Sequence, residues 1–404
     1  MIKVGSDFSG VGAFNQALIR LGIPFKEIFA CDMDKYARQT FIHNYGEPKY
    51  YPMNVYEREI PSESLDIYMT SPPCQAFSLA GKRLGKDDKR GILFFNSHEF
   101  IQVNKPRFFI FENVKGLLSD DGGKTFSEWC NMLGGKSVNG NPVLFPYEDA
   151  VPYHLYWKVL NAKEHGVPQN RERVFLIGIR DDNDNSFRFP VEEHLTKRLK
   201  DVLEDKVDEK YFLSEKIIKG FINKKDAENY SFSPKDGNDI SQCLTARYFK
   251  MGATDPYIKI KSATSKGYED FWVADGNSPA IMAMMRDTWK ENFTGQNPPI
   301  IKYNDKRLNE TLEKNNLPKG DIKAIDTYNK KVQDNAPTLT EPHHNTTRLW
   351  DGYKIRRLTP RECFRLMDFP DTFTWPVSDS QAYKQAGNSI VVNVLYKILK
   401  NLPL

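Results

Sequence analysis

The first 180 residues alternate between two hydrophobic patterns, and this alternation limits the folds open to the chain. Short apolar runs are separated by stretches whose apolar residues recur at helical spacing. Strand candidates are Ile2–Asp7, Ile28–Cys31, Leu65–Met69, Phe108–Phe111 and Val174–Ile179, and helix candidates are Ala13–Leu21, Lys35–His43 and Leu93–Val103. Strands that alternate with helices form βαβ units, so we expect an α/β fold with a mostly parallel, doubly wound sheet.

The pattern changes at about residue 181 and returns after Gly352. Residues 181–351 are rich in Lys, Asn and Asp, with short irregular runs, which indicates a smaller domain. Thr359–Met367 begins with Thr-Pro, a favourable helix start, and Gly387–Leu402 is a strongly apolar amphipathic segment. We therefore predict a first domain at 1–180, an inserted domain at 181–351 and a C-terminal segment at 352–404 that returns to the first domain.

The composition is that of an ordinary globular protein, with 40% hydrophobic and 27% charged residues. No run of about 18 apolar residues is present, so we expect no membrane span. The N-terminus lacks the basic and apolar regions of a signal peptide. The net charge of +4 permits a polyanionic partner without requiring one. The five cysteines include no Cys-x-x-Cys pair, so we expect a reducing compartment, no disulfide framework and no metal site.

A glycine-rich turn, Phe8-Ser9-Gly10-Val11-Gly12, follows the first predicted strand. Such a turn lets a ligand approach the backbone and the N-terminus of the next helix. Asp32 follows the next strand about 20 residues later, where an acidic side chain can hold ribose hydroxyls. The third glycine of the dinucleotide fingerprint is missing, which disfavours NAD. These features predict a nucleotide or nucleoside cofactor, and a tight turn without a ligand remains the alternative.

Polar clusters lie next to three of the predicted strands. Ser71-Pro72-Pro73-Cys74-Gln75 ends one strand, and its prolines stiffen the backbone before the thiol. Glu112-Asn113-Val114 ends a second strand, and Gln169-Asn170-Arg171-Glu172-Arg173 precedes a third. Taken singly, each has a structural interpretation: a buried cysteine, a solvated carboxylate or a surface ion pair. Together, at one edge of a sheet, they predict a cleft that can hold the polar edge of a base.

Five motifs, in this order, resemble the hallmark motifs of bacterial cytosine-C5 DNA methyltransferases. They are Phe8-x-Gly10-x-Gly12, Pro73-Cys74-Gln75, Glu112-Asn113-Val114, Gln169-x-Arg171-x-Arg173 and Gln385-x-Gly387-Asn388-Ser389. The resemblance covers roughly positions 1–180 and 352–404. It implies a Rossmann-like methyltransferase fold and methyl transfer from S-adenosylmethionine, with S-adenosylhomocysteine as product. The acceptor would be C5 of a cytosine flipped out of duplex DNA.

The resemblance gives catalytic roles to four residues. Cys74 would add to cytosine C6, and Glu112 would contact the ring N3 and amino group and help its protonation. Arg171 would hold the base O2, whereas Arg173 would support Cys74 and its loop. Residues of that loop that would contact DNA are Gln75, Ser78, Lys82 and Arg83.

The resemblance also implies a cofactor site. Asp32 would hold the ribose of S-adenosylmethionine. Met33 stands where an aromatic side chain often packs on adenine, and Asn54 replaces the usual Asp. The other implied cofactor contacts are Phe8, Ser9, Gly10, Gly12, Val55, Pro73, Leu93, Asn388 and Ser389.

In the family that it resembles, the region corresponding to 181–351 carries target recognition. Two candidate segments are Cys243–Arg247 and Ala336–Thr340, the second followed by His343-His344, a pattern too short for a metal site. Threonine can reach a phosphate and arginine can read guanine. Short strands of a small domain are an equal alternative for both. The predicted DNA contacts are Thr245, Arg247, Thr338 and Thr340.

The expected partner is double-stranded DNA, and a cognate restriction endonuclease acting on the same site is a candidate second partner. A phage-borne or orphan methylase is the alternative. We expect a monomer in the cytoplasm, associated with the nucleoid. Three rival functions are a tRNA methyltransferase, a catalytically inactive DNA-binding protein and a NAD-dependent dehydrogenase. The long insertion opposes the first, the intact Cys74, Glu112 and Arg171 oppose the second, and the cysteine loop opposes the third.

Overall fold

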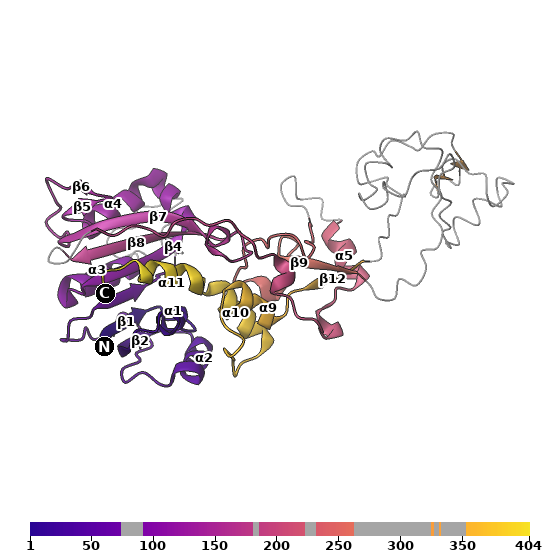
Figure 1. Cartoon of the computed structure of the whole chain (residues 1–404), viewed down its shortest axis with the longest axis horizontal. Coiled ribbons are helices and arrows are strands. Elements are labelled where there is room, and N and C mark those ends of the chain that lie inside the picture. Colours follow the sequence, from indigo (N-terminus) through magenta and orange to yellow (C-terminus); the bar gives the residue numbers. More distant parts are fainter. Residues whose placement is uncertain (74–91, 181–185, 223–231, 262–324, 327–330, 333–352) are drawn as a thin grey trace. The chain divides into compact units, whose positions relative to one another are not determined.

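The computed structural model describes residues 1–73, 92–180, 186–222, 232–261, 325–326, 331–332 and 353–404 (Figure 1). The chain divides into two compact units, Met1–Lys259 with Ile355–Leu404, and Ile260–Lys354. In the second unit, β10 (Ile325–Asp326) pairs antiparallel with β11 (Lys331–Val332). The first unit contains the sheet and every described residue of the candidate site.

An eight-stranded sheet of order β2-β1-β3-β4-β8-β7-β5-β6 forms the centre of the first unit. Its strands are β1 (Ile2–Asp7), β2 (Phe25–Cys31), β3 (Ile67–Thr70), β4 (Phe108–Val114), β5 (Ser137–Val138), β6 (Asn141–Pro142), β7 (Tyr153–Asn161) and β8 (Glu172–Arg180). The first four strands in this order pair in parallel, which confirms the predicted α/β class. Because β2 and β3 flank β1 on opposite sides, the chain reverses its direction of winding there, and ligands of such sheets bind outside the strand ends at that point.

Strand β8 runs antiparallel to β4 and to β7. Its first residues, rather than its last, therefore lie at the edge where the parallel strands end. Register pairs Val114 with Arg173 and Asn113 with Val174. This reversal brings the Gln169–Arg173 motif beside Glu112, as the sequence order alone could not show.

The described residues form the following helices. They are α1 (Ala13–Leu21), α2 (Lys35–Tyr45), α3 (Ile92–Asn104), α4 (Lys124–Leu133), α5 (Glu215–Ile222), α9 (Pro360–Leu366), α10 (Asp379–Asn388) and α11 (Val392–Lys400). Short 3-10 turns are η2 (Lys115–Gly123), η3 (Ala162–His165), η4 (Leu199–Asp201), η5 (Glu209–Tyr211) and η6 (Tyr248–Lys250). Helix α11 packs on α1 and runs in front of the sheet in Figure 1. The end of the chain thus returns to its beginning.

The C-terminal helices confirm the predicted helix start at Thr359-Pro360 and divide the amphipathic segment Gly387–Leu402. Helix α9 begins after Thr359, whose hydroxyl accepts the Glu362 amide while the Glu362 carboxylate accepts the Thr359 amide. The segment Gly387–Leu402 is not continuous: α10 ends at Asn388, and Ser389–Val391 is not helical. Arg171 takes the carbonyls of Gly387 and Ser389, and two β-branched residues follow, which together favour the break.

The predicted domain boundary at residue 181 does not coincide with the division between the compact units. Residues up to Lys259 belong to the first unit. Backbone contacts explain this, since Gln169 bridges to Ser241 and Lys235 to Ile258. Strand β9 (Tyr257–Lys261) pairs with β12 (Tyr353–Arg357). The recognition function predicted for 181–351 stays a prediction.

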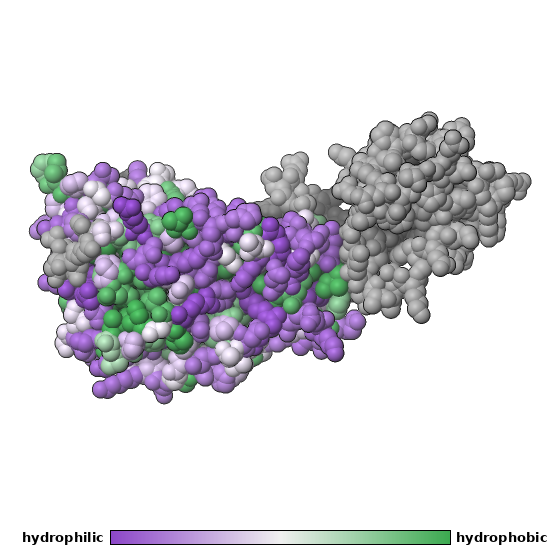
Figure 2. Space-filling view, viewed as in Figure 1, coloured by the Kyte–Doolittle hydropathy of each residue, from purple (hydrophilic) through white to green (hydrophobic). Residues whose placement is uncertain are grey.

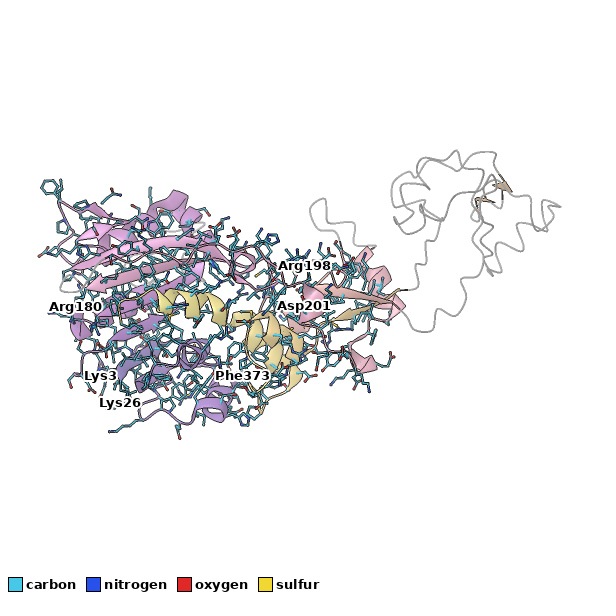
Figure 3. All side chains as sticks on the ribbon, in the orientation of Figure 1. Lys3, Lys26, Arg180, Arg198, Asp201 and Phe373 are labelled. Carbon is cyan, nitrogen blue, oxygen red and sulfur yellow. The ribbon has the colours of Figure 1, made fainter. Side chains whose placement is uncertain are left out.

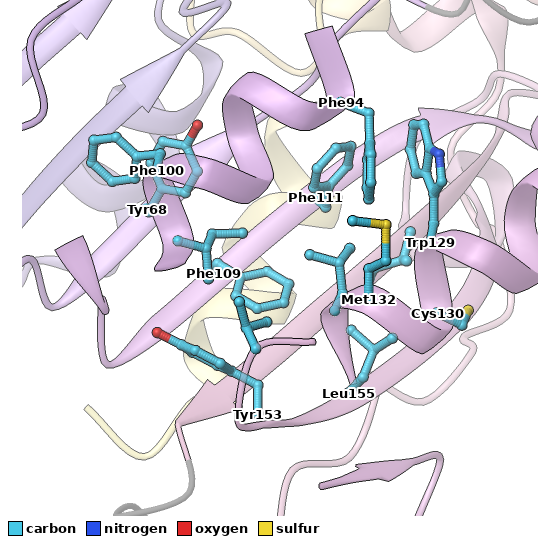
Figure 4. Close-up of a cluster of buried hydrophobic side chains, with 14 of the residues drawn as sticks. Tyr68, Phe94, Phe100, Phe109, Phe111, Trp129, Cys130, Met132, Tyr153 and Leu155 are labelled. Atoms are coloured by element: carbon cyan, nitrogen blue, oxygen red, sulfur yellow. The ribbon is translucent and has the colours of Figure 1, made fainter. Parts of the chain in front are cut away.

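Aromatic side chains fill the core between the sheet and helices α3 and α4 (Figure 4). Phe94 stacks on Trp129 with ring centroids 4.2 Å apart, and Tyr68 stacks on Phe100 at 4.1 Å. Each fully buried ring of this kind contributes about 1.5–3 kcal/mol through burial of apolar surface. Strand β4 enters this core through Phe109 and Phe111, so its end, where Glu112 lies, is held rigidly.

At the end of the sheet where the parallel strands begin, several cationic side chains contact other groups of the protein. Figure 3 labels Lys3, Lys26 and Arg180 at this end. Lys3 lies 2.9 Å from Glu63 and Lys26 lies 3.9 Å from the same carboxylate. Arg180 donates to the Lys105 carbonyl. These contacts stabilise the ends of the strands. The candidate site lies at the opposite end of the sheet, where the parallel strands finish.

The face drawn in Figure 2 is mostly hydrophilic, with hydrophobic side chains gathered in a few patches. No helix among the described residues combines the length and apolar character needed to cross a membrane.

Candidate active site

The glycine-rich turn after β1 has a backbone that only some residues tolerate. Gly10 and Gly12 have φ values of 55° and 85°, and Phe8 between β1 and these glycines has φ 57°. A Cβ on Gly12 would lie 2.2 Å from the Tyr45 ring, so glycine is required there by packing. A Cβ on Gly10 would meet nothing within 4 Å. The turn is therefore open beside Gly10, next to the N-terminus of α1.

Asp32 fixes this turn from the end of β2. Its carboxylate accepts the Gly10 amide at 2.8 Å and the Asp34 amide at 2.8 Å. Burial raises its pKa, while these two backbone donors oppose the rise. Ser9 is held by the Cys31 carbonyl and lies 3.3 Å from the Tyr51 hydroxyl. A carboxylate and an open glycine turn at a helix N-terminus fit the ribose and amino-acid parts of S-adenosylmethionine.

A buried ion pair between Arg58 and Asp7 lies at the end of β1, next to the glycine-rich turn. Arg58 Nε lies 3.0 Å from Asp7 Oδ1, and the Tyr68 hydroxyl donates to Asp7 Oδ2 at 2.6 Å. Burial raises the pKa of Asp7, and the Arg58 charge opposes this. The Arg58 guanidinium also lies 4.7 Å from the Phe100 ring centroid. Asp7 directly precedes Phe8, so this pair fixes the end of β1.

The residues predicted on the adenine side lie in different surroundings. Met33 is 81% exposed, which leaves its thioether available to a ligand. Asn54 accepts the Tyr56 amide and donates to Glu57, so its side chain closes its own turn. Val55 is buried, and Leu93 packs against the aromatic core. At the end of α10, Asn388 is exposed whereas Ser389 is buried and donates to the Ile390 carbonyl.

The structure brings Glu112 and Arg173 together at the carboxyl edge. Arg173 Nε lies 3.1 Å from Glu112 Oε1, and the Glu112 side chain is only 10% exposed. Burial raises the pKa of Glu112, while the charges of Arg173 and Arg171 act in the opposite direction. A carboxyl group with a raised pKa can carry a proton and deliver it to a base.

The strand that leads to Cys74 is anchored beside this pair. Asn113 donates from Nδ2 to the Pro72 carbonyl at 3.1 Å, and Pro73 is exposed. The described residues run to Pro73, one residue before the predicted nucleophile, and resume at Ile92. Site residues predicted from the sequence that lie outside the described residues are Cys74, Gln75, Ser78, Lys82, Arg83, Thr338 and Thr340.

Arg171 contacts backbone groups, and its predicted role at the base stays a prediction. Its NH1 donates to the Leu244 carbonyl and the Cys243 sulfur, and its NH2 donates to the carbonyls of Gly387 and Ser389. Burial lowers its pKa to about 10, so the guanidinium remains charged near neutral pH. These bonds occupy NH1 and NH2, whereas Nε is buried without a hydrogen-bond partner among the described residues.

Three of the described cysteines have buried thiols with raised pKa values, whereas a nucleophilic cysteine needs an accessible thiolate. Cys31 and Cys130 are buried, and burial raises the pKa of each thiol to about 12. Burial also raises the pKa of Cys363. Thiols with raised pKa values are poor nucleophiles. Cys243 is half-buried, and its sulfur accepts a hydrogen bond from Arg171.

Sequence reasoning missed three residues that shape the cofactor turn: Tyr45, Tyr51 and Arg58. Tyr45 packs on Gly12, and the Arg38 guanidinium lies 3.7 Å from the Tyr51 ring centroid. A weak signal existed, since Tyr50-Tyr51 and Arg58 flank the predicted Asn54-Val55 contacts. Thr245 and Arg247, by contrast, were predicted as DNA contacts, and both side chains are exposed.

The chain is similar to known methyltransferases over nearly its whole length. Orphan methyltransferase M.SPRI of Bacillus phage SPR is 30% identical, over 99% of this chain and 97% of its own length. Type II methyltransferase M1.ScrFI of Lactococcus lactis subsp. cremoris is 28% identical, over 98% of this chain and 76% of its own.

Solved structures share the fold. Dnmt2 methyltransferase of S. pombe superposes with a TM-score of 0.61 at 18% identity, over 99% of this chain and 97% of that one. A DNMT2 mutant of Spodoptera frugiperda gives 0.63 at 20% identity, over 99% of each chain. The C-5 cytosine-specific DNA methylase family matches residues 2–403. The chain belongs to this family, and it is a DNA cytosine-5 methyltransferase that depends on S-adenosylmethionine.

Proposed function

We propose that the chain methylates a cytosine flipped out of duplex DNA, with Cys74 as nucleophile and Glu112 as proton donor. The observation that carries this proposal is the buried Glu112–Arg173 pair, 3.1 Å apart, beside the strand that leads to Cys74. A base inside a duplex is inaccessible to such a site, so the target must leave the helix.

Cysteine suits the first step because a thiolate is a strong nucleophile. Addition of Cys74 forms a bond from sulfur to C6, and a proton from Glu112 moves to N3. The ring becomes an enamine whose C5 is nucleophilic. Once C5 carries the methyl group, a water molecule accepts the C5 proton as the Cys74 thiolate leaves C6. N3 returns its proton to the Glu112 carboxylate, which restores the aromatic ring and the enzyme.

The two arginines divide the remaining work. Arg173 contacts the Glu112 carboxylate, and we propose that it also donates to the base O2. Its positive charge also favours the thiolate of a cysteine nearby. Arg171 binds backbone carbonyls, and its contact with the base O2 stays a prediction.

Residues around the β1 turn would hold the cofactor, which supplies an electrophilic methyl group when bound. Asp32 would bind the ribose hydroxyls, and Met33 and Val55 would flank the adenine. The remaining cofactor contacts are Phe8, Ser9, Gly10, Gly12, Asn54, Pro73, Leu93, Asn388 and Ser389. Supporting observations are the open space beside Gly10 and the exposure of Met33.

Residues 181–351 would select the DNA sequence. The exposed side chains of Thr245 and Arg247 support this for their segment. Thr338 and Thr340, with Gln75, Ser78, Lys82 and Arg83 of the Cys74 loop, complete the proposed contacts. We propose that the enzyme acts as a monomer at the nucleoid. A cognate endonuclease and an orphan role are both compatible with its relatives, which include a type II and an orphan methyltransferase.

The test is methyl transfer from labelled S-adenosylmethionine to duplex DNA and to tRNA, followed by digestion to nucleosides. The proposal expects label in 5-methylcytosine from DNA, and none with Cys74→Ser. The same variant should still bind duplex DNA. Label in tRNA alone, on another base, or with Cys74→Ser overturns it.

A further inference from the structure

The segment that carries Thr245 and Arg247 is bonded directly to the motif that precedes β8. The Asn170 amide donates to the Ser241 carbonyl at 2.8 Å, and the Ser241 amide donates to the Pro168 carbonyl at 2.9 Å. Gln169 is fully buried and bonds on both sides. Its Oε1 accepts the Leu244 amide at 3.1 Å, and its Nε2 donates to the Leu366 carbonyl at 2.8 Å.

Arg171 makes the second connection. One guanidinium nitrogen donates to the Leu244 carbonyl at 2.7 Å, and the other donates to the Ser389 carbonyl at 2.7 Å and the Gly387 carbonyl at 3.1 Å. The arginine is 3% exposed. A planar guanidinium fixes such acceptors in one geometry, which a lysine ammonium cannot reproduce.

Gly387 provides a third point of contact. A Cβ at this position would lie 2.3 Å from the backbone carbon and oxygen of Thr245. The neighbour is backbone, so it cannot move aside as a flexible side chain would. Only glycine lets the end of α10 and the 245–246 backbone approach this closely.

We infer that Arg171 is a positioning residue that, with Gln169 and Gly387, fixes the DNA-reading segment Cys243–Arg247 relative to the base pocket. The inference rests on the proposed reading role of Thr245 and Arg247. Arg171 and Arg173 are two residues apart, so in extended chain they point to the same side. Glu172 between them pairs instead with Lys115. Residues 171–173 thus make two contacts. Arg171 bonds to the reading segment, and Arg173 pairs with the Glu112 carboxylate.

The experiment compares Arg171→Met and Gly387→Ala, which disturb the same contact from opposite sides. It measures kcat and KM on duplex DNA and the ratio of methylation at the cognate site to a site that differs by one base pair. Both variants should lower that ratio by about tenfold and kcat/KM by about 100-fold, since small misplacements have effects of that size. The double variant should lose little more than either single variant, because both act on one contact.

Controls separate this inference from the proposed function and from simple loss of folding. Thr245→Val and Arg247→Gln should change site preference; if neither does, the proposed reading role fails. Arg198→Met is the matched arginine, since Arg198 also donates to backbone carbonyls, those of Leu195 and Lys197. It should leave the discrimination ratio unchanged.

If Arg171→Met does not fold, Arg171→Lys and Gly387→Ala decide the question. A fall in kcat with unchanged discrimination in these variants, or additive losses in the double variant, overturns the positioning role.

Discussion

Glu112 and Glu27 are both carboxyl groups whose pKa is raised by burial, but their neighbours differ. Glu112 faces Arg173 at the edge where the parallel strands end. Glu27 lies on β2 and accepts a hydrogen bond from Asn15 Nδ2 at 2.9 Å. Burial raises the pKa of Glu27 to about 7. The two residues therefore contrast the proposed proton donor with a carboxyl group whose contact is a hydrogen bond from Asn15.

Replacing Glu112 with Gln should lower kcat by about 100-fold or more, because general acid catalysis contributes about 10²–10⁴-fold. The amide cannot supply a proton to N3, yet it keeps a similar shape beside Arg173. Steady-state kinetics on duplex DNA measure the loss, and cofactor binding should be retained. Glu27→Gln is the matched control and should remain active. Near-normal turnover by Glu112→Gln would remove Glu112 from the mechanism.

Glu27→Gln should instead change the pH dependence of stability. The folded pKa of Glu27 is about 7, above its ordinary 4.5. The folded state thus holds the proton more tightly, so the wild type loses stability as pH rises between these values and no more above them. Near pH 8 the variant should be more stable by about 2 kcal/mol, allowing for partial exposure, with little difference near pH 4. Denaturant unfolding at both pH values measures this; a pH-independent difference would contradict the assignment.

At the residue scale, the sequence indicated which residues carry reactive groups, but it did not indicate which hydrogen bonds those residues make. Glu112 and Asp32 could be singled out because both lie at strand ends: Asp32 directly follows β2, and Glu112 lies near the end of β4. The backbone contacts of Arg171 could not be predicted, since they depend on which carbonyls lie beside its guanidinium. Those carbonyls belong to residues 244, 387 and 389, far away in sequence.

At the scale of elements, local pattern sufficed where the chain decides its own structure. Helix α1 has the predicted bounds, and Gly12 and Gly22 flank it in left-handed conformations. Strand β7 and helix α4 were not predicted, and the break at Ser389–Val391 was missed. The break depends on Arg171, a tertiary contact that no local pattern contains.

The two glycines that flank α1 offer a matched pair. Gly12→Ala and Gly22→Ala both place a Cβ on a left-handed residue, which costs about 1 kcal/mol. Only Gly12 would also clash with Tyr45, and nothing lies within 4 Å of a Cβ on Gly22. Gly12→Ala should therefore lose about 1–3 kcal/mol more. It should also weaken S-adenosylhomocysteine binding, measured by calorimetry. Equal losses in stability and unchanged affinity in both variants would contradict this account of the turn.

At the scale of the whole molecule, the sequence predicted an inserted recognition domain at 181–351, whereas the second compact unit is Ile260–Lys354. Composition marks where regular patterns stop, but it does not show which irregular segments pack on the sheet. The reading segment Cys243–Arg247 lies between the two boundaries. The two divisions therefore make different predictions about specificity.

Two chimeras with a relative of known target site distinguish them. Exchange of 181–351 should transfer the relative's site, because it moves every proposed reading segment. Exchange of 260–354 alone should not transfer it fully, because Thr245 and Arg247 remain. Sequencing of methylated cytosines in DNA from expressing cells reads the outcome. An active long chimera that keeps the original site would contradict the assignment of recognition to 181–351.

The central claim is covalent attack by Cys74, and DNA with 5-fluorocytosine at the target site tests it most directly. Fluorine at C5 cannot leave as a cation, so the enzyme should remain bonded to C6 after methyl transfer. The account predicts an adduct that survives denaturing electrophoresis, requires S-adenosylmethionine, contains Cys74 in its crosslinked peptide and is absent with Cys74→Ser. A trapped peptide that contains Cys31, Cys130, Cys243 or Cys363 would contradict it. So would the absence of any adduct on DNA whose unmodified form the enzyme methylates.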